Sequence, residues 1–354
     1  MNKTYRSLWN ESLGAWVAAS ENTRACGKRG GGRVALAAVA SVLGLLSLSA
    51  QAQVNCSAPP YNFYSGSATC AGYLSQATLG GATAIGYNAQ STGLNAATLG
   101  YQALATATNA IYIGARTGGT GASGQSSIAI GTDVNSSGDA AVAVGAQSKA
   151  TGLRGIALGA QANAAVDYAT ALGGGGVSPA TAVRATGVGS TALGGNATSG
   201  ALASGADAIA IGGQSVSSTQ YSVAIGLNAA ASGAGGAVAI GASAVSNNVN
   251  TVALGVNANA TGAGASALGT ASTATGGNST AVGVNSVAGA NFAFAGGYLS
   301  QATGLRTVAV GNQAEATSDA ATSVGNTARA LGNSSLALGA QALAIGDSTV
   351  AVGQ

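Results

Sequence analysis

The sequence predicts an all-β protein, a parallel β-solenoid with coils of about fourteen residues. After residue 70, a glycine closes an aliphatic–alanine–aliphatic segment at regular intervals, as at Gly241, Gly255, Gly269 and Gly283. A fixed period of this kind is typical of a solenoid or repeat array. The alternation in Ser127–Gly131 is the period of two expected for strands with one buried face. Helices are disfavoured, because each interior glycine costs a helix about 1 kcal/mol.

Composition excludes several classes of protein. The chain has 354 residues with 58 Gly, 3 Pro and no His, so His-based nucleophilic catalysis, proton shuttling and the usual zinc sites are excluded. Hydrophobic residues make up 47%, which is too many for a disordered tail. Half of the 12 Lys and Arg lie at or before Arg33, and the remainder of the chain is nearly neutral. We therefore expect no enzyme activity, no catalytic residue, no cofactor, no metal site and no nucleic-acid partner.

Residues 1–52 are predicted to be a targeting segment. A positive stretch at 24–33 precedes an apolar stretch at 34–50, and Ala50-Gln51-Ala52 matches a signal-peptidase site. Cleavage is expected between Ala52 and Gln53. The alternative is a membrane-anchoring helix, but the apolar stretch is short and rich in small residues. Residues 24–52 are thus interpreted as the signal peptide proper, and residues 1–23 as an additional region ahead of it.

Residues 53–71 are expected to cap the solenoid. After cleavage, Cys56 and Cys70 would be the remaining cysteines, and in an oxidising compartment they would pair, with a stabilisation of roughly 3 kcal/mol. Two buried thiols or an incomplete metal pair are the alternatives. The aromatic residues Tyr61, Phe63 and Tyr64 are interpreted as part of the cap, because terminal repeats need one, with a ligand patch as the alternative.

The repeats at 72–354 each read as strand, turn, short strand, turn. Glycine permits positive φ at the first turn, and Asn or Gln two residues later, as at Asn88 and Gln102, is expected to bond the turn or form ladders between coils. Four intervals between closing glycines are longer than the rest, and they are interpreted as insertions near 118–119, 174–188, 201–207 and 235.

The aliphatic pair of each segment is expected to lie inside the coil. Two buried aliphatic side chains return far less free energy than the ordering of one whole coil costs. We therefore expect the alanine-rich face of each coil to pack against identical neighbouring chains in a closed oligomer, whose number of chains this reasoning leaves open.

Other motifs are weak. Gly119–Gly124 fits G-x-G-x-x-G, but no helix pattern follows it, so a nucleotide site is not expected. The acidic residues never form a calcium-binding repeat and are interpreted as solvated turn residues. They are Asp133, Asp139, Asp167, Asp207, Glu315, Asp319 and Asp347.

Two parts of the sequence resemble a known family. Residues 1–10, Met-Asn-Lys-Thr-Tyr-Arg-Ser-Leu-Trp-Asn, resemble the extended signal peptide region of Gram-negative autotransporters and large exoproteins. Segments such as Tyr221–Ala229, Ser127–Gly131 and Ser335–Ala342 resemble the head repeats of YadA-like trimeric autotransporter adhesins. The resemblance covers nearly the whole chain.

This resemblance implies a left-handed parallel β-roll that assembles as a homotrimer on the surface of a Gram-negative bacterium. It implies adhesion to host extracellular matrix such as collagen, to host cells, or self-association, without identifying ligand-binding residues. A non-adhesive structural or ice-binding solenoid is the alternative, but it would need a flat Thr-x-Thr ladder. A hexapeptide acyltransferase would need a six-residue period and a catalytic His.

The family also has a coiled-coil stalk and a β-barrel anchor. The sequence up to Gln354 contains neither heptads nor a run of alternating membrane strands. We therefore expect a fragment, which would meet the membrane only through an anchor outside this chain. A complete chain would be periplasmic or secreted.

Overall fold

The computed structural model describes residues 5–10, 15–20, 67–118, 121–175 and 178–353, in two units, Met1–Ala52 and Gln53–Gln354. In the first unit, β1 (Tyr5–Asn10) pairs antiparallel with β2 (Ala15–Ser20). The described residues include no helix of the length and apolar character needed to cross a membrane. The apolar stretch at 34–50 and the predicted cleavage site at Ala52 and Gln53 lie outside the described residues.

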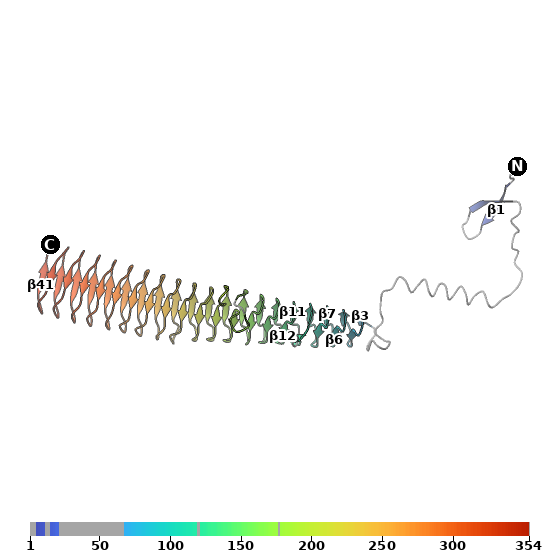
Figure 1. Ribbon diagram of the computed structural model, residues 1–354, viewed down its shortest axis with the longest axis horizontal. Coiled ribbons are helices and arrows are strands. Elements are labelled where there is room, and N and C mark those ends of the chain that lie inside the picture. The colour runs from blue at the N-terminus through green and yellow to red at the C-terminus, as the bar shows by residue number, and fades with distance from the viewer. Residues whose placement is uncertain (1–4, 11–14, 21–66, 119–120, 176–177, 354) are drawn as a thin grey trace. The chain divides into compact units, whose positions relative to one another are not determined.

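The second unit is a parallel β-solenoid, in which the described residues form strands and turns and no helix (Figure 1). Each coil contributes one strand to each of two sheets, and each strand pairs with its counterpart in the next coil, as Val252 pairs with Ser266. That pairing joins residues one full repeat apart in the sequence. The prediction of an all-β parallel solenoid with this repeat length is therefore confirmed.

The first sheet, called here the three-residue sheet, runs the length of the described solenoid. Its strands are β3 (Thr69–Ala71), β5 (Thr83–Ile85), β7 (Ala97–Leu99), β9 (Ile111–Ile113), β11 (Ile128–Ile130), β13 (Val142–Val144), β15 (Ile156–Leu158), β17 (Thr170–Leu172), β19 (Thr191–Leu193), β21 (Ile209–Ile211), β23 (Val223–Ile225), β25 (Val238–Ile240), β27 (Val252–Leu254), β29 (Ser266–Leu268), β31 (Thr280–Val282), β33 (Phe294–Gly296), β35 (Val308–Val310), β37 (Thr322–Val324), β39 (Leu336–Leu338) and β41 (Val350–Val352).

The second, called the two-residue sheet, closes the other side of each coil. Its strands are β4 (Gln76–Ala77), β6 (Gln90–Ser91), β8 (Leu104–Ala105), β10 (Gly121–Ala122), β12 (Asn135–Ser136), β14 (Lys149–Ala150), β16 (Asn163–Ala164), β18 (Arg184–Ala185), β20 (Leu202–Ala203), β22 (Val216–Ser217), β24 (Ala230–Ala231), β26 (Val245–Ser246), β28 (Asn259–Ala260), β30 (Thr273–Ala274), β32 (Val287–Ala288), β34 (Gln301–Ala302), β36 (Glu315–Ala316), β38 (Arg329–Ala330) and β40 (Leu343–Ala344).

The turn after each three-residue strand, called here the glycine turn, needs its glycine for two reasons. Gly255 has φ +140°, and a Cβ on it would lie 2.4 Å from the carbonyl oxygen of Gly269 in the next coil. Two residues later, Asn257 has φ 56°, in the left-handed region that Asn tolerates. The predicted ladders also form, since Gln161 Nε2 donates to Gln147 Oε1 at 3.1 Å. The turn prediction is confirmed.

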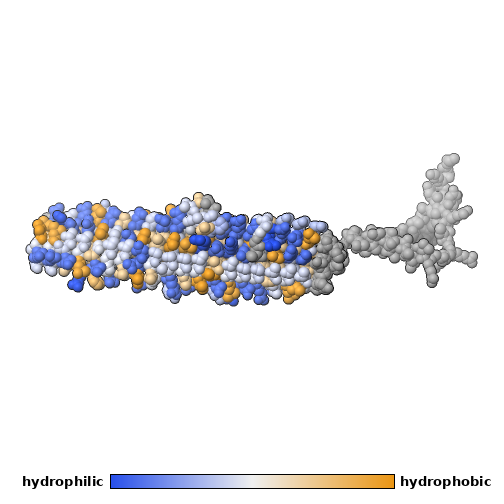
Figure 2. Space-filling model, turned by 60° about the horizontal axis from the view of Figure 1, so that its bottom comes forward, coloured by the Kyte–Doolittle hydropathy of each residue, from blue (hydrophilic) through white to orange (hydrophobic). Residues whose placement is uncertain are grey.

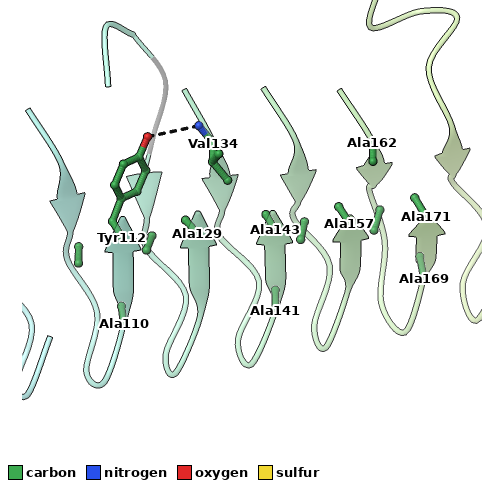
Figure 3. Packing of buried hydrophobic residues seen from close by; sticks show 14 of the residues in the cluster. Ala110, Tyr112, Ala129, Val134, Ala141, Ala143, Ala157, Ala162, Ala169 and Ala171 are labelled. Atoms are coloured by element: carbon green, nitrogen blue, oxygen red, sulfur yellow. Dashed lines mark hydrogen bonds between the residues drawn. The ribbon is translucent and has the colours of Figure 1, made fainter. Parts of the chain in front are cut away.

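The interior is made mostly of alanine, and two predictions are wrong: the aliphatic pair does not lie inside the coil, and the alanine-rich face is already buried within one chain, so it is not the surface left for neighbouring chains. Ala253 is fully buried, whereas Leu254 beside it is 37% exposed and Val252 half-buried. Figure 3 shows the same arrangement at Ala129, Ala143 and Ala157, whose methyl groups point into the coil. The physical reason is the narrow coil: inward positions of both sheets are mostly Ala or Ser, so the space between the sheets accepts little more than a methyl group.

Most polar interior side chains are hydrogen-bonded, whereas the buried hydroxyls of Ser91, Ser127, Ser279 and Ser323 have no partner among the described residues. Ser272 Oγ donates to the carbonyl of Gly269 at 2.9 Å, and Ser335 Oγ donates to that of Gly332 at 2.6 Å. Because most such hydroxyls bond the backbone three residues earlier, serine can replace alanine in the core at little cost.

Tyr112 is the largest fully buried side chain among the described residues (Figure 3). It stands where other coils have an inward alanine. Its hydroxyl donates to the carbonyl of Ala115 at 3.2 Å and accepts from the backbone N–H of Val134 at 3.4 Å. The glycine turn that follows β9 carries the insertion before β10, so the widened turn provides the room and the partners for a buried phenol.

Three of the four insertions lie at glycine turns. They precede β10, β18 and β20, whereas the one-residue insertion at 232–237 lies at the opposite turn. The insertion expected at 201–207 instead occupies 195–201, because β20 begins at Leu202. Sequence spacing measures the length of a coil but not which of its two turns takes the extra residues.

Candidate functional site

The outward side of the three-residue sheet is a largely apolar surface, called here the apolar face, in which Thr or Ser occupies the first position of seven strands. Each strand places its first and third residues outward, and from β3 to β41 none of these residues is charged. Before the last strand, the exposed large side chains of this face range from 37% exposed at Ile130 to 49% at Leu99. A surface of this length on an isolated chain is typical of an interface.

The outward side of the two-residue sheet, called here the polar face, is more polar, although several of its strands begin with Leu or Val. A Thr or Ser follows most of its strands, and its charged residues are Lys149, Arg184, Glu315 and Arg329. Arg329 Nε lies 2.6 Å from Glu315 Oε2, in the adjacent coil. A Thr-x-Thr ladder would need threonine on both sides of the inward residue in successive coils. Among the described strands of this sheet, that pattern occurs once, at Thr273–Thr275, so there is no such ladder. Figure 2 shows one side of the solenoid, with hydrophobic groups separated by hydrophilic ones.

A tyrosine ladder lies at the glycine turns of the first coils, and sequence reasoning missed it. Ring centroids of Tyr73 and Tyr87 are 5.8 Å apart, and those of Tyr87 and Tyr101 are 5.4 Å apart with an interplanar angle of 8°. All three rings are exposed. The signal was present as a Gly-Tyr pair that recurs at 72–73, 86–87 and 100–101, in step with the coils.

Most acidic residues connect neighbouring coils rather than only facing solvent. In each of four turns, an Asp Oδ1 accepts from the backbone N–H of the residue 14 positions earlier, at 2.8 to 3.0 Å. These residues are Asp139, Asp167, Asp319 and Asp347. Asp207 lies at a turn position with φ 53°. The interpretation as turn residues holds for the aspartates, whose carboxylates also link neighbouring coils, but it is wrong for Glu315, which lies in strand β36.

Asp133 anchors the first insertion. Its Oδ1 accepts from the backbone N–H groups of Gly118, at 2.9 Å, and Thr117, at 2.6 Å, and its Oδ2 lies 2.7 Å from the Thr117 hydroxyl. These bonds, the Gly118 N–H first, lower the pKa of the Asp133 carboxyl below its ordinary value. Burial raises the pKa of the nearby Tyr112 phenol, because the charged form loses solvation.

The remaining predicted sites are largely outside the described residues. Cys70 is buried and its sulfur is in a disulfide, but Cys56 is not described, so their pairing stays a prediction. Tyr61, Phe63 and Tyr64 are also outside. In the G-x-G-x-x-G segment, Gly121 and Ala122 form β10, and no helix follows in the described residues. Those residues also contain no cluster of three metal-ligating side chains.

Two family descriptions match the chain. Residues 1–50 match "Extended Signal Peptide of Type V secretion system". Thirteen segments between residues 72 and 354 match "YadA head domain repeat (2 copies)" and leave 98–121 and 176–184 as the longest uncovered stretches within the repeats. No curated protein matches.

The fold and these matches define an adhesin head with a repeated, solenoidal surface, which its leader directs through type V secretion to the cell surface. The chain belongs to the YadA-like trimeric autotransporter adhesins. Membership of this family, together with a solenoid fold, favours a structural, non-enzymatic protein.

Proposed function

We propose that three copies of this chain, each wound as the left-handed roll that the family implies, assemble through their apolar faces. The head then adheres to host extracellular matrix of the collagen type or to host cells, or associates with itself. The observation that carries this proposal is the uncharged apolar face that extends from β3 to β41. Coils with alanine interiors bury few large side chains, so covering this face supplies the apolar burial that one chain lacks.

The assembly directs the polar face and the turns outward. These surfaces repeat every coil and occur three times in a trimer, so many weak contacts would combine into high avidity without a deep pocket. The tyrosine ladder and the insertions at the glycine turns add variation to this repeated surface.

A matched pair of substitutions tests the interface. Val238 lies on the apolar face and Val245 on the polar face, and both are half-buried in the single chain. Val238→Asp places three carboxylates in the proposed interface, where desolvation is costly. Sedimentation equilibrium is expected to show trimers for wild type and Val245→Asp, and monomers for Val238→Asp. A monomeric wild type, or dissociation by Val245→Asp alone, would contradict the assembly.

Binding is tested separately in solid phase. Wild-type trimers are applied to immobilised collagen, laminin and fibronectin, with albumin as the control. Saturable binding to at least one matrix protein is expected, with weaker binding by the monomeric Val238→Asp variant, because avidity is lost. Failure on all three with intact trimers would reject matrix adhesion and leave host cells or self-association.

We further propose that residues 1–52 are removed after Ala52, that 53–71 cap the first coil, and that Cys56 pairs with Cys70. Mass spectrometry of the exported protein tests all three points. The expected results are an N-terminus at Gln53, a peptide joined by the Cys56–Cys70 bond before reduction, and protection of 53–71 from limited proteolysis.

A further inference from the structure

The second and third insertions together form a hollow on the polar face. Its lining includes Thr181, Arg184, Ser199, Leu202, Gln214 and Val216. The insertion loops contact each other directly, because the backbone N–H of Gly200 donates to the carbonyl of Thr181 at 2.7 Å, and Gln214 N–H donates to the Ser199 carbonyl at 3.2 Å. The hollow is therefore held in place by backbone bonds between three successive coils.

The hollow has one charge and it is positive. Arg184 lies outward on β18, and no described residue forms an ion pair or a side-chain hydrogen bond with its guanidinium. No acidic residue lines the hollow. Arg329 occupies the equivalent place on β38, but there Glu315 neutralises it. An unneutralised guanidinium in a hollow is suited to binding a carboxylate through two parallel bonds.

Uncharged polar groups surround this cation. The Ser199 hydroxyl and the Gln214 side-chain amide have no hydrogen-bond partner among the described residues, whereas the Thr181 hydroxyl is engaged with Ser178. Leu202 and Val216 add an apolar floor. An acidic sugar carries a carboxylate, hydroxyls and an apolar C–H face. It can therefore use the cation, the uncharged polar groups and the apolar floor of the hollow together, whereas an acidic peptide side chain offers only the carboxylate.

We propose that the hollow binds the carboxylate-bearing sugar of an acidic glycan. Arg184 holds the carboxylate, Ser199 and Gln214 bond the sugar hydroxyls, and Leu202 and Val216 contact its C–H face. Residues 176–184, which include Arg184, fall outside the matched head repeats, so the cation of this site is not part of the matched repeat pattern. The proposal deepens the adhesin function by naming a ligand class, and rests on that function for its biological setting.

Isothermal titration of the full chain with sialyllactose, lactose and a glutamate-rich peptide tests the proposal. Sialyllactose is expected to bind at least tenfold more tightly than lactose, which lacks the carboxylate. Arg184→Gln is expected to weaken sialyllactose binding by about 10- to 100-fold, the usual effect of losing a charge-assisted bond. Arg329→Gln, the matched control, should leave affinity unchanged, and circular dichroism checks that both variants fold.

Three results would overturn the proposal: equal affinity for lactose, full affinity in Arg184→Gln, or binding of the peptide alone. If Arg184→Gln fails to fold, Ser199→Ala replaces it, with a several-fold loss expected for sialyllactose and none for the peptide. The hollow lies within a single chain, so the monomeric Val238→Asp variant should retain sialyllactose affinity. A failure of trimerisation or matrix binding is thereby distinguishable from a failure of this site.

Discussion

Neighbouring coils approach each other most closely at glycines of the turn that follows the two-residue strand. Substitution of one of them, Gly262, tests how much this close approach contributes to stability. Gly262 is buried and has no positive φ, so backbone strain does not enter. A Cβ on it would lie 2.0 Å from the carbonyl oxygen of Gly276 in the next coil. Such atoms rarely approach closer than about 3 Å, so Gly262→Ala must separate the two coils locally by about 1 Å.

That separation breaks bonds as well as contacts. The N–H of Thr261 donates to the carbonyl of Ala274 at 2.9 Å, and the N–H of Gly262 donates to the same oxygen at 3.3 Å. Lengthening either by about 1 Å takes it beyond hydrogen-bond distance. With about 1 kcal/mol for each of the two lost bonds and about 1 to 3 kcal/mol for overpacking, we expect a destabilisation of about 3 to 5 kcal/mol.

Gly289 is the matched control. A Cβ there meets only ordinary contacts, the nearest being Thr303 Cγ2 at 3.5 Å. Gly289→Ala should be neutral or stabilise by up to about 1 kcal/mol, because alanine restricts the unfolded chain. Equilibrium denaturation followed by far-ultraviolet circular dichroism, at one protein concentration, measures both. Equal stability of Gly262→Ala and wild type, or equal losses in the two variants, would refute the role assigned to coil contact.

Three further predictions concern side chains. Tyr112→Ala should cost about 3 to 5 kcal/mol by leaving a cavity, and Tyr112→Phe about 1 kcal/mol, both measured by denaturant unfolding. The folded-state pKa of Asp133 lies below its ordinary 3.8, so this carboxylate stabilises the first insertion above pH 3.8, and the stabilisation is lost as pH falls through the folded pKa. The protection of the Thr117 and Gly118 amides from hydrogen exchange should therefore decrease as the pH falls through that range. Asp133→Asn should abolish this pH dependence. Tyr87→Ala should remove two ring contacts, at about 0.5 to 1.5 kcal/mol each. The ring of Tyr298 has no stacked partner among the described residues, so Tyr298→Ala should cost less stability. Thermal unfolding of the two variants measures the difference.

Local sequence patterns predicted the fold class because each coil repeats the same short signals. The glycine at Gly255 and the Asn at Asn257 mark a turn by their backbone preferences alone, and Val252, Ala253 and Leu254 mark a strand by alternation. None of these inferences needs knowledge of distant residues. They therefore established coil length, strand positions and turn chemistry correctly.

Alternation shows that successive side chains point to opposite sides of a strand, but it does not show which side faces the interior, because the same pattern fits either orientation. Only the close approach of the two sheets decided that Ala253 lies inside and Leu254 outside, and so where the apolar face lies. The hollow depends on the same kind of information, because Arg184, Ser199 and Gln214 come from three coils and meet only where two insertion loops pack together. The sequence thus specified the repeating coil, and tertiary packing selected the surfaces available for binding.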